Sequence, residues 1–571
     1  MQTNRAFGIL DSIEVPMRDG TILRADIWLP QGEGPWPVIL QRTPYRKEDA
    51  FGTQYISGLD FRAALKRGYA IVIQDTRGRY SSDGAFAPFA HEADDGADTI
   101  GWLREQAFCN GKVVMFGASY VGATQVLAAS ANPQGLLAIS PHLTTARHGD
   151  TWTYRSGAVE LAFLLLWITE SLGQSDLDHR LAAIPTLDIE RARKALLNLQ
   201  RDPQAAFSRL PILDDDLLAL APYAAQWFDG DSAASSAANR EHLDALARIG
   251  LPVLVSCGWN DLFVEGSIEL FQTVRSRWGR AEAVRDRLII GPWSHGNPTD
   301  WQGDFWLGYA AATVGLSDEQ LDFFDAAIAG TAPQTPIVRY FRSGSNTWHA
   351  APDWPLPGSI RREVFLTKAE LSDHPGAAWS RSFTSDTLSP VPTTGGATFV
   401  PGLLQGRNSG PKDQALVEQR DDVLVFTSTT LGEDLEVTGL VEATVWVSST
   451  GQSADWTARL CEVDGRGRSI GLLDGIHRET QASAVPHAVT IRLGHVSHLF
   501  RKGNQIRLQL ASSNFPRFDR NPQSGKPATL AMREDFKPAT HSIYGGLKMP
   551  SCLTLAVIVY PFPNLQTFHL S

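Results

Sequence analysis

The feature that most constrains this chain is a change in the spacing of its hydrophobic residues. Through about residue 140, and again from about residue 253, short continuous apolar runs alternate with amphipathic segments. Strands that are apolar on both sides and are separated by helices predict a buried, mostly parallel sheet. The apolar runs are 38–41, 69–74, 113–116, 136–139, 253–256 and 287–290, and the helical segments include 91–106 and 120–131.

Two other regions have different patterns. Between the two α/β parts the spacing is helical, so we assign residues 1–144 and 249–352 to one α/β unit and 145–248 to a helical cap inserted into it. Residues 374–402 are rich in Ser, Thr, Pro and Gly and are predicted to form long loops. Beyond them apolar and polar residues alternate, so 353–571 is predicted to be an all-β jelly roll.

Composition excludes several classes of protein. With 43% hydrophobic and 20% charged residues the chain is not intrinsically disordered, and its net charge of −11 argues against nucleic-acid binding. The longest apolar run, 161–168, is too short to cross a membrane, and the first residues lack a signal-peptide pattern. We therefore expect a cytoplasmic protein. Its four cysteines lack metal-binding or disulfide spacing and stand at Cys109, Cys257, Cys461 and Cys552.

The candidate nucleophile is Ser119, in the sequence Gly117-Ala-Ser-Tyr-Val-Gly122. A predicted strand precedes this motif and a predicted helix follows it, as in a nucleophile elbow. The turn is sharp and needs small residues on both sides of the serine, which Gly117 and Gly122 provide. Serines close to glycines are common, so the alternative is an ordinary structural turn.

A nucleophilic serine needs a base and a residue that orients the base. Asp261 follows the predicted strand 253–256, and His295 follows the next one, 287–290. Parallel strands end at the same sheet edge, so both side chains are expected near Ser119. Each has another interpretation, Asp261 as a loop-capping residue and His295 as one of 14 histidines on the surface.

An oxyanion hole needs two hydrogen-bond donors. The amide of Tyr120, directly after the nucleophile, is one candidate. The loop after strand 38–41 usually supplies the second, and here it contains Tyr45, whose phenol could donate. From position alone, Tyr45 could equally be a surface tyrosine.

Together these motifs resemble the bacterial cocaine esterase family, which is related to X-prolyl dipeptidyl peptidases and α-amino-acid ester hydrolases. The resemblance covers nearly the whole chain and includes the motifs at 44–45, 75–78, 82–84, 117–122, 258–263, 291–295, 420–423, 437–439 and 512–516. It implies an α/β-hydrolase fold with an inserted helical cap domain and a C-terminal all-β jelly-roll domain. By this resemblance Ser119 is the nucleophile, His295 the base and Asp261 its orienting acid, while Tyr45 and Tyr120 form the oxyanion hole.

The resemblance also implies a pocket for an aromatic acyl group. The matching positions are Gln54, Trp152, Trp167, Phe263, Leu403 and Leu404. For the aromatic residues the alternative is ordinary core packing. The leucines stand beside Gln405, where the family pattern has an aromatic residue, so this part of the pocket departs from the resemblance.

The predicted function is that of a serine hydrolase which cleaves carboxylic esters of an aromatic or bulky acid, with no cofactor or metal. Its predicted partner is a small-molecule ester, and a homodimer is possible. One alternative is a dipeptidyl aminopeptidase or β-lactam acylase, which would need carboxylates for a substrate ammonium. Candidates are the acids at 214–216, 229 and 231, although a solvated helix end explains them too. Another alternative is a non-catalytic carbohydrate-binding protein.

Overall fold

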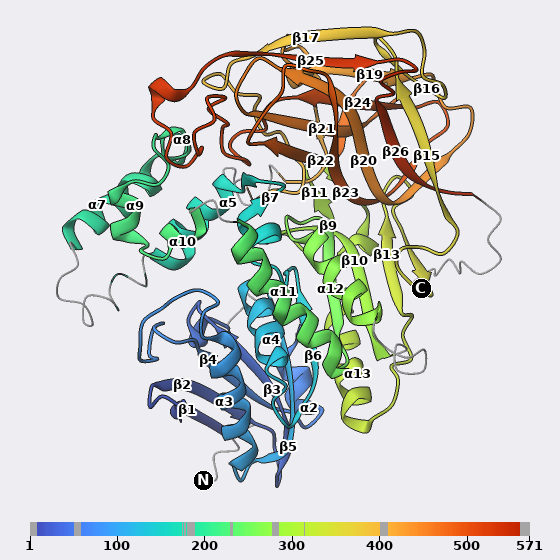
Figure 1. Ribbon diagram of the computed structural model, residues 1–571. Coiled ribbons are helices and arrows are strands. Elements are labelled where there is room, and N and C mark those ends of the chain that lie inside the picture. The colour runs from blue at the N-terminus through green and yellow to red at the C-terminus, as the bar shows by residue number, and fades with distance from the viewer. Residues whose placement is uncertain are drawn as a thin grey trace.

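Strands from both predicted parts of the α/β unit join one ten-stranded sheet (Figure 1). The computed structural model describes residues 8–50, 59–173, 175, 177, 179, 189–228, 232–276, 285–312, 315–399 and 409–559. Seven neighbouring strands of this sheet run parallel, namely β4, β3, β5, β6, β9, β10 and β13. Antiparallel strands flank them on both sides. The order across the sheet is β1 (Gly8–Pro16), β2 (Ile22–Leu29), β4 (Ala70–Asp75), β3 (Trp36–Thr43), β5 (Cys109–Ala118), β6 (Leu136–His142), β9 (Leu254–Asn260), β10 (Arg287–Ser294), β13 (Val338–Arg342) and β14 (Thr347–Ala351).

Both faces of this sheet are covered, which explains the continuous apolar runs. In β5, Val113 and Met115 belong to the hydrophobic cluster on one face, and Val114 and Phe116 to the cluster on the other. Side chains alternate between the faces of a strand, so each residue of such a run is buried in one core or the other.

The helices divide between these two faces. One cluster contains residues of α3 (Glu92–Glu105), α4 (Tyr120–Ser130), α11 (Ser232–Ile249) and α12 (Val264–Ser276). The other contains residues of α2 (Phe61–Lys66) and α13 (Leu316–Ala329). Short elements complete the unit: α1 (Lys47–Ala50), β11 (Trp301–Gln302), β12 (Phe305–Trp306) and the 3₁₀ turn η4 (Tyr309–Ala311).

The helical insertion projects to one side of the molecule (Figure 1). Its elements are η1 (Gly149–Thr153), β7 (Tyr154–Arg155), β8 (Ala158–Val159), α5 (Leu161–Leu166), η2 (Trp167–Leu172), α7 (Ile189–Arg201), α8 (Pro203–Ser208), α9 (Asp215–Leu220) and α10 (Ala224–Phe228). All of helix α11 except Ile249 lies within the predicted cap range 145–248, but it packs against α4 and α12 of the α/β unit as well as against η1. The predicted domain boundaries stay predictions.

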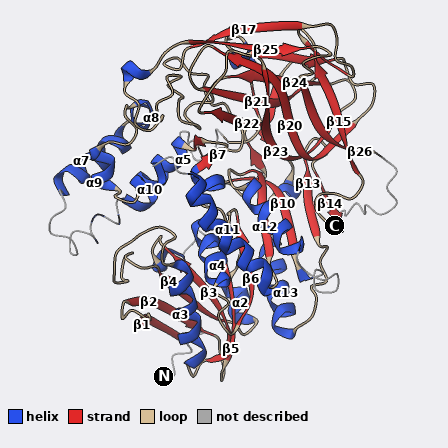
Figure 2. Cartoon of the chain, in the orientation of Figure 1, coloured by secondary structure: helices blue, strands red, loops and turns tan. Residues whose placement is uncertain are grey.

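The C-terminal region is a β-sandwich, as the alternating pattern predicts, and Figure 2 shows that strands dominate it. Strand β23 pairs with β20, and the other strands follow the order β17-β25-β20-β26-β15-β16-β19-β24-β21-β22-β18. Their bounds are β15 (Ser359–Leu366), β16 (Glu370–Ser372), β17 (Trp379–Ser385), β18 (Lys412–Asp413), β19 (Leu424–Ser428), β20 (Leu435–Ser449), β21 (Ala454–Val463), β22 (Ser469–Glu479), β23 (His487–Phe500), β24 (Gln505–Ala511), β25 (Ala539–Gly545) and β26 (Cys552–Ile558). Two short helical elements accompany them, α14 (Ala415–Glu418) and the 3₁₀ turn η5 (Arg533–Asp535).

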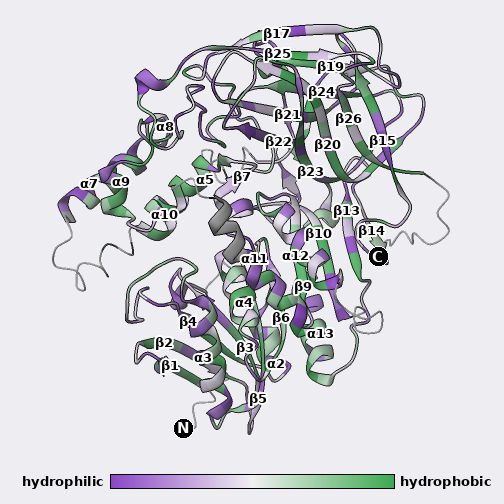
Figure 3. Ribbon diagram, viewed as in Figure 1, coloured by the Kyte–Doolittle hydropathy of each residue, from purple (hydrophilic) through white to green (hydrophobic). Residues whose placement is uncertain are grey.

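Strand β17 corrects one expectation, because residues 374–402 were predicted to be loops throughout. It pairs antiparallel with β25 along its whole length at the edge of the sheet order. Exposed Ser and Thr side chains alternate along it with half-buried or buried side chains such as Phe383. In Figure 3 this strand is mixed in hydropathy, whereas β26 in the middle of the sheet is predominantly hydrophobic. Edge strands are often polar, so the composition of this strand resembled that of a loop and the sequence did not predict it.

The start of the insertion is anchored on the β-sandwich. Val159 and Asp519 exchange two hydrogen bonds, of 2.8 and 3.0 Å, and the Ala162 amide donates to the Pro516 carbonyl at 3.1 Å. The Arg517 guanidinium lies between the carboxylates of Glu160 and Asp474, all of them buried. These contacts hold α5 and η2 in place. Among the described residues, no helix is both long and apolar enough to span a membrane.

Candidate active site

Ser119 stands at a sharp turn between β5 and α4. Its φ of 60° is positive, which is rare for a residue other than glycine, and its amide donates to the His142 carbonyl at 2.9 Å. Gly117 has a φ of +140°, and a Cβ there would lie 2.3 Å from the Val121 side chain. At Gly122 a Cβ would lie 2.7 Å from Thr144. Both glycines are therefore required for the turn that presents Ser119.

The structure brings Ser119, His295 and Asp261 together, although they lie on three different loops. His295 Nε2 lies 3.1 Å from Ser119 Oγ, and His295 Nδ1 lies 2.7 Å from Asp261 Oδ1. The other oxygen of Asp261 accepts from the Phe263 amide at 3.1 Å, and this side chain is fully buried. The carboxylate can therefore hold the imidazole with Nδ1 protonated and with Nε2 ready to accept the serine proton.

A second histidine, His142, lies close enough to His295 to be affected by its charge, and it is neutral. Its Nδ1 lies 2.7 Å from Ser256 Oγ, and the side chain is buried. Burial, and next the proximity of His295, lowers the pKa of His142 to about 3. The backbone carbonyl of His142 also accepts from the Ser119 amide and so supports the elbow.

Tyr45 and Tyr120 belong to the same buried cluster of side chains, and their hydroxyls have different partners. Trp167 Nε1 donates to the Tyr45 hydroxyl at 2.8 Å. The Tyr120 hydroxyl donates to Glu92 at 2.8 Å and accepts from the Phe89 amide at 2.9 Å. The Tyr120 backbone amide begins α4, where the first N–H groups have no partner within the helix.

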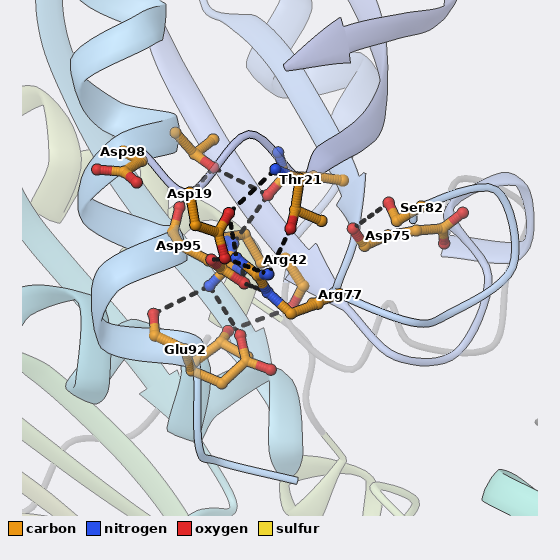
Figure 4. A network of polar contacts seen from close by, with 12 residues as sticks. Asp19, Thr21, Arg42, Asp75, Arg77, Ser82, Glu92, Asp95 and Asp98 are labelled. Carbon is orange, nitrogen blue, oxygen red and sulfur yellow. Dashed lines mark hydrogen bonds and ion pairs between the residues drawn. The ribbon is translucent and has the colours of Figure 1, made fainter. Parts of the chain in front are cut away.

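Figure 4 shows a network of polar contacts that includes the buried side chains of Arg42, Glu92 and Asp95. Arg42, on the strand that leads to Tyr45, contacts Glu92 at 2.8 Å and Asp95 at 3.8 Å. Burial raises the pKa of Glu92 above its usual value, although the Arg42 guanidinium opposes the shift. Through Glu92 the network connects the Tyr45 loop with the Tyr120 side chain.

Aromatic rings surround the histidine side of this site. Phe263 packs edge to face against His295 at 5.2 Å and stacks on Trp152 at 4.3 Å. Trp152 lies 5.2 Å from Trp167, and the indole N–H of Trp152 is buried with no partner among the described residues. These three residues were predicted for the pocket, whereas Gln54, Leu403 and Leu404 lie outside the described residues.

Sequence reasoning missed other members of this aromatic cluster. Phe399 packs against His295 at 5.4 Å, Phe163 stacks on Trp167 at 5.8 Å, and Trp227 stacks on Trp167 at 5.1 Å. Phe89 contacts Tyr120 at 4.8 Å. Only Phe163 had a signal, because it falls within the apolar run 161–168. The others sit on segments whose proximity to the site depends on the tertiary fold.

The described members of the predicted acidic group have partners of their own. Asp214 caps α9 by accepting from the Leu217 amide at 2.9 Å. Asp215 and Asp216 pair with Arg191 on the surface, at 3.3 and 2.7 Å. The acids at 229 and 231 are outside the described residues. Within the described part of the chain, no group of three His, Cys, Asp or Glu residues is arranged to hold a metal ion.

Comparison with known proteins agrees with this architecture. Residues 19–297 match the family model of the X-Pro dipeptidyl-peptidase (S15 family), and residues 330–554 match the model of the X-Pro dipeptidyl-peptidase C-terminal non-catalytic domain. Cocaine esterase of Rhodococcus sp. (strain MB1 Bresler) is 34% identical, over 97% of this chain and 99% of its own length.

Two solved structures share the fold with TM-scores of 0.78. An α-amino acid ester hydrolase is 25% identical, over 98% of this chain and 97% of that one. An aminopeptidase from a marine sediment Thaumarchaeota archaeon is 24% identical, over 97% of each chain. The predicted combination of an α/β-hydrolase, a helical insertion and a C-terminal β-sandwich is confirmed.

Proposed function

This chain is a serine hydrolase of the cocaine esterase (CocE/NonD) family, and from that premise we propose that it cleaves carboxylic esters of an aromatic or bulky acid through an acyl-enzyme on Ser119. The observation that carries the proposal is the Ser119–His295–Asp261 arrangement, at 3.1 and 2.7 Å, beside a wall of aromatic rings.

The first half of the reaction forms the acyl-enzyme. Ser119 Oγ attacks the ester carbonyl while His295 Nε2 takes its proton, and Asp261 stabilises the imidazolium that results. The Tyr45 hydroxyl and the Tyr120 amide donate to the oxygen that becomes negative. When the intermediate collapses, His295 returns the proton to the leaving alcohol. Water, deprotonated by the same imidazole, then releases the acid and restores Ser119.

The aromatic wall supports a preference for the acyl group. Phe263 and Phe399 both contact the His295 ring, so they lie next to the atoms that react. An aromatic acyl group placed there would be desolvated and packed against rings, which favours it over a short aliphatic one. The preference therefore rests on residues that also position the base.

An α-amino substrate is less well supported by the charges near the site. Such a substrate needs a carboxylate beside its ammonium, but Glu92 is already bonded to Tyr120 and paired with Arg42. Asp214, Asp215 and Asp216 are used for helix capping and surface pairing.

A panel of esters tests the proposal. We expect kcat/KM to be highest for benzoyl or phenylacetyl esters, lower for acetyl and butyryl esters, and lowest for matched α-amino esters. A fluorophosphonate probe should label the protein but not the Ser119→Ala variant. Faster turnover of α-amino esters or X-Pro dipeptide amides would contradict the proposed substrate class, while labelling of the Ser119→Ala variant would contradict the nucleophile.

A further inference from the structure

Arg79 is a fully buried arginine on the loop that follows β4, and it contacts the segment that carries Tyr45. Its guanidinium lies against two aromatic rings, 4.8 Å from the centre of Phe86 and 5.3 Å from that of Tyr80. Burying a charged group costs free energy that its partners must offset, so the groups that Arg79 bonds indicate what this residue does.

One of these partners belongs to the Tyr45 segment. Arg79 Nε donates to the Pro44 carbonyl at 2.8 Å, and the Tyr45 amide donates to Thr43 Oγ1 at 3.1 Å. Both polar atoms of the peptide unit between Pro44 and Tyr45 are therefore bonded. The Cα atom of Tyr45 belongs to this planar unit, so the two bonds fix the point from which the tyrosine side chain starts.

The other bonds of the guanidinium reach the helical insertion. Arg79 Nη1 donates to the carbonyl of Leu172, the last residue of η2, at 3.1 Å, and Nη2 donates to Ser175 Oγ at 2.5 Å. The first residue of η2 is Trp167, whose indole N–H donates to the Tyr45 hydroxyl at 2.8 Å. A single planar group therefore connects the backbone at the base of Tyr45 with the helix that contacts its hydroxyl.

The loop that carries this arginine is also joined directly to the Tyr45 segment. The Thr76 amide donates to the Thr43 carbonyl at 3.0 Å, and the Lys47 amide donates to Asp75 Oδ1 at 2.8 Å. Thr43 precedes Tyr45 and Lys47 follows it, so the two loops are bonded on both sides of the tyrosine. The guanidinium extends this bonded unit to the insertion.

We propose that Arg79 is a positioning residue, which holds the Tyr45 hydroxyl where it donates to the substrate oxygen during acylation of Ser119. The inference rests on the oxyanion role proposed above for Tyr45. A donor stabilises developing charge only when it is already correctly placed, and a displacement of about 1 Å can cost about 10²-fold in rate. Arg79 limits such a displacement, because one rigid, planar guanidinium bonds both segments that determine where the hydroxyl lies.

The test compares Arg79→Met with the wild type and repeats the comparison in the Tyr45→Phe background. Methionine keeps an unbranched apolar side chain but loses every hydrogen bond of the guanidinium. We expect kcat on an activated benzoate ester to fall about 10- to 100-fold and KM to change less than about threefold, because the hydroxyl acts in the transition state. In the Tyr45→Phe background the same change should lower kcat less than about threefold, because the hydroxyl that Arg79 positions is already absent.

A second measurement does not depend on the substrate class. When a fluorophosphonate labels the protein, Ser119 Oγ forms a bond to phosphorus, fluoride leaves and His295 takes the serine proton. The phosphoryl oxygen then takes the place of the ester carbonyl oxygen, so the labelling rate should fall about 10- to 100-fold in Arg79→Met and less than about threefold in the Tyr45→Phe background. If the wild type is labelled but hydrolyses no benzoate ester, the proposed substrate class fails and the labelling rates still test Arg79.

Arg287→Met is the matched control. Arg287 is 4% exposed, and its guanidinium also donates to two backbone carbonyls, those of Asp286 and Pro333. It begins the eight-residue strand β10, whereas His295 follows the opposite end of that strand. Both arginine variants should lose stability in urea unfolding, but Arg287→Met should keep kcat and the labelling rate within about threefold of the wild type, because distant sites without shared partners act independently.

Two further variants separate geometry from charge and keep the test open if Arg79→Met does not fold. Arg79→Lys retains the positive charge but lacks the planar fork, so it should restore only part of kcat. Ser175→Ala removes one partner on the insertion and leaves the buried charge in place. It should lower kcat about two- to fivefold, as expected for one weakened hydrogen bond, and should have no effect in the Tyr45→Phe background.

Several results would overturn the proposal. These are wild-type kcat in a folded Arg79→Met variant, equal losses in the two Tyr45 backgrounds, an equal loss of kcat in Arg287→Met, or full recovery by Arg79→Lys, which would mean that charge alone is required. If neither Arg79 variant folds, unchanged kcat in Ser175→Ala overturns it as well. None of these results affects ester hydrolysis by the wild type, so the two proposals can fail separately.

Discussion

Removal of the Tyr45 hydroxyl tests the proposed oxyanion hole most directly. In Tyr45→Phe the ring and its packing remain, but the proposed donor to the substrate oxygen is lost. Loss of one such donor costs roughly 10²–10³ in kcat, or about 2.7–4 kcal/mol of transition-state stabilisation. The bond strengthens only as charge develops, so KM should change much less than kcat.

The same substitution has a second, separable cost. Trp167 is 3% exposed and its indole N–H donates to the Tyr45 hydroxyl, so this donor becomes buried without an acceptor. We expect a loss of about 1–3 kcal/mol in the free energy of unfolding. Urea unfolding measures this cost, and saturation kinetics on one activated benzoate ester measure the catalytic one.

Tyr120→Phe is the matched control, because it removes the same atom from the neighbouring tyrosine. That hydroxyl bonds Glu92 and the Phe89 amide, while the proposed donor at this residue is the backbone N–H. The variant should also lose stability, but kcat should fall by less than about tenfold. Unchanged kcat in Tyr45→Phe, or equal kcat losses in the two variants, would refute the role of the Tyr45 hydroxyl.

The remaining predictions concern the nucleophile, the buried ion pair and the buried histidine. Ser119→Ala should keep the circular dichroism spectrum and lower kcat by several orders of magnitude, leaving a residual of roughly 10³–10⁴-fold over water; near-normal kcat would exclude Ser119 as the nucleophile. Glu92→Gln should lower the free energy of unfolding by about 1.5–3 kcal/mol, because the fully buried Arg42 loses its nearer charged partner at 2.8 Å while Asp95 remains at 3.8 Å; an unchanged free energy in urea unfolding would contradict this. Because the folded pKa of His142 is about 3, below the unfolded value of about 6.5, the unfolded chain alone takes up this proton as pH falls from 6.5 to 3. Unfolding free energies at pH 7, 6 and 5 should therefore fall more steeply in the wild type than in His142→Asn, by up to about 1.4 kcal/mol per pH unit, and equal slopes would count against a buried neutral His142.

Much of this fold was predictable because its signals are local. Each strand of the parallel sheet is buried on both faces, and a short apolar run records that directly, as in β5. The signal of the nucleophile elbow is also local, because it lies within the six residues 117–122. The positive φ of Ser119 and the side chains close to the Cα atoms of Gly117 and Gly122 limit which residue types fit there. The edge strand β17 was missed because only one side of it is buried, so its polar composition resembled a loop.

The sequence by itself determined which residues could act as nucleophile, acid and base, because the ends of parallel strands place their loops at one edge. Only the tertiary structure decided the distances between them, and only it showed what surrounds them. Phe399 reaches His295 from the β-sandwich side of the chain, and Glu92 reaches Tyr120 from another helix. The physical reason is that backbone geometry depends on neighbours in sequence, whereas side-chain packing and buried ion pairs depend on segments that meet only after folding.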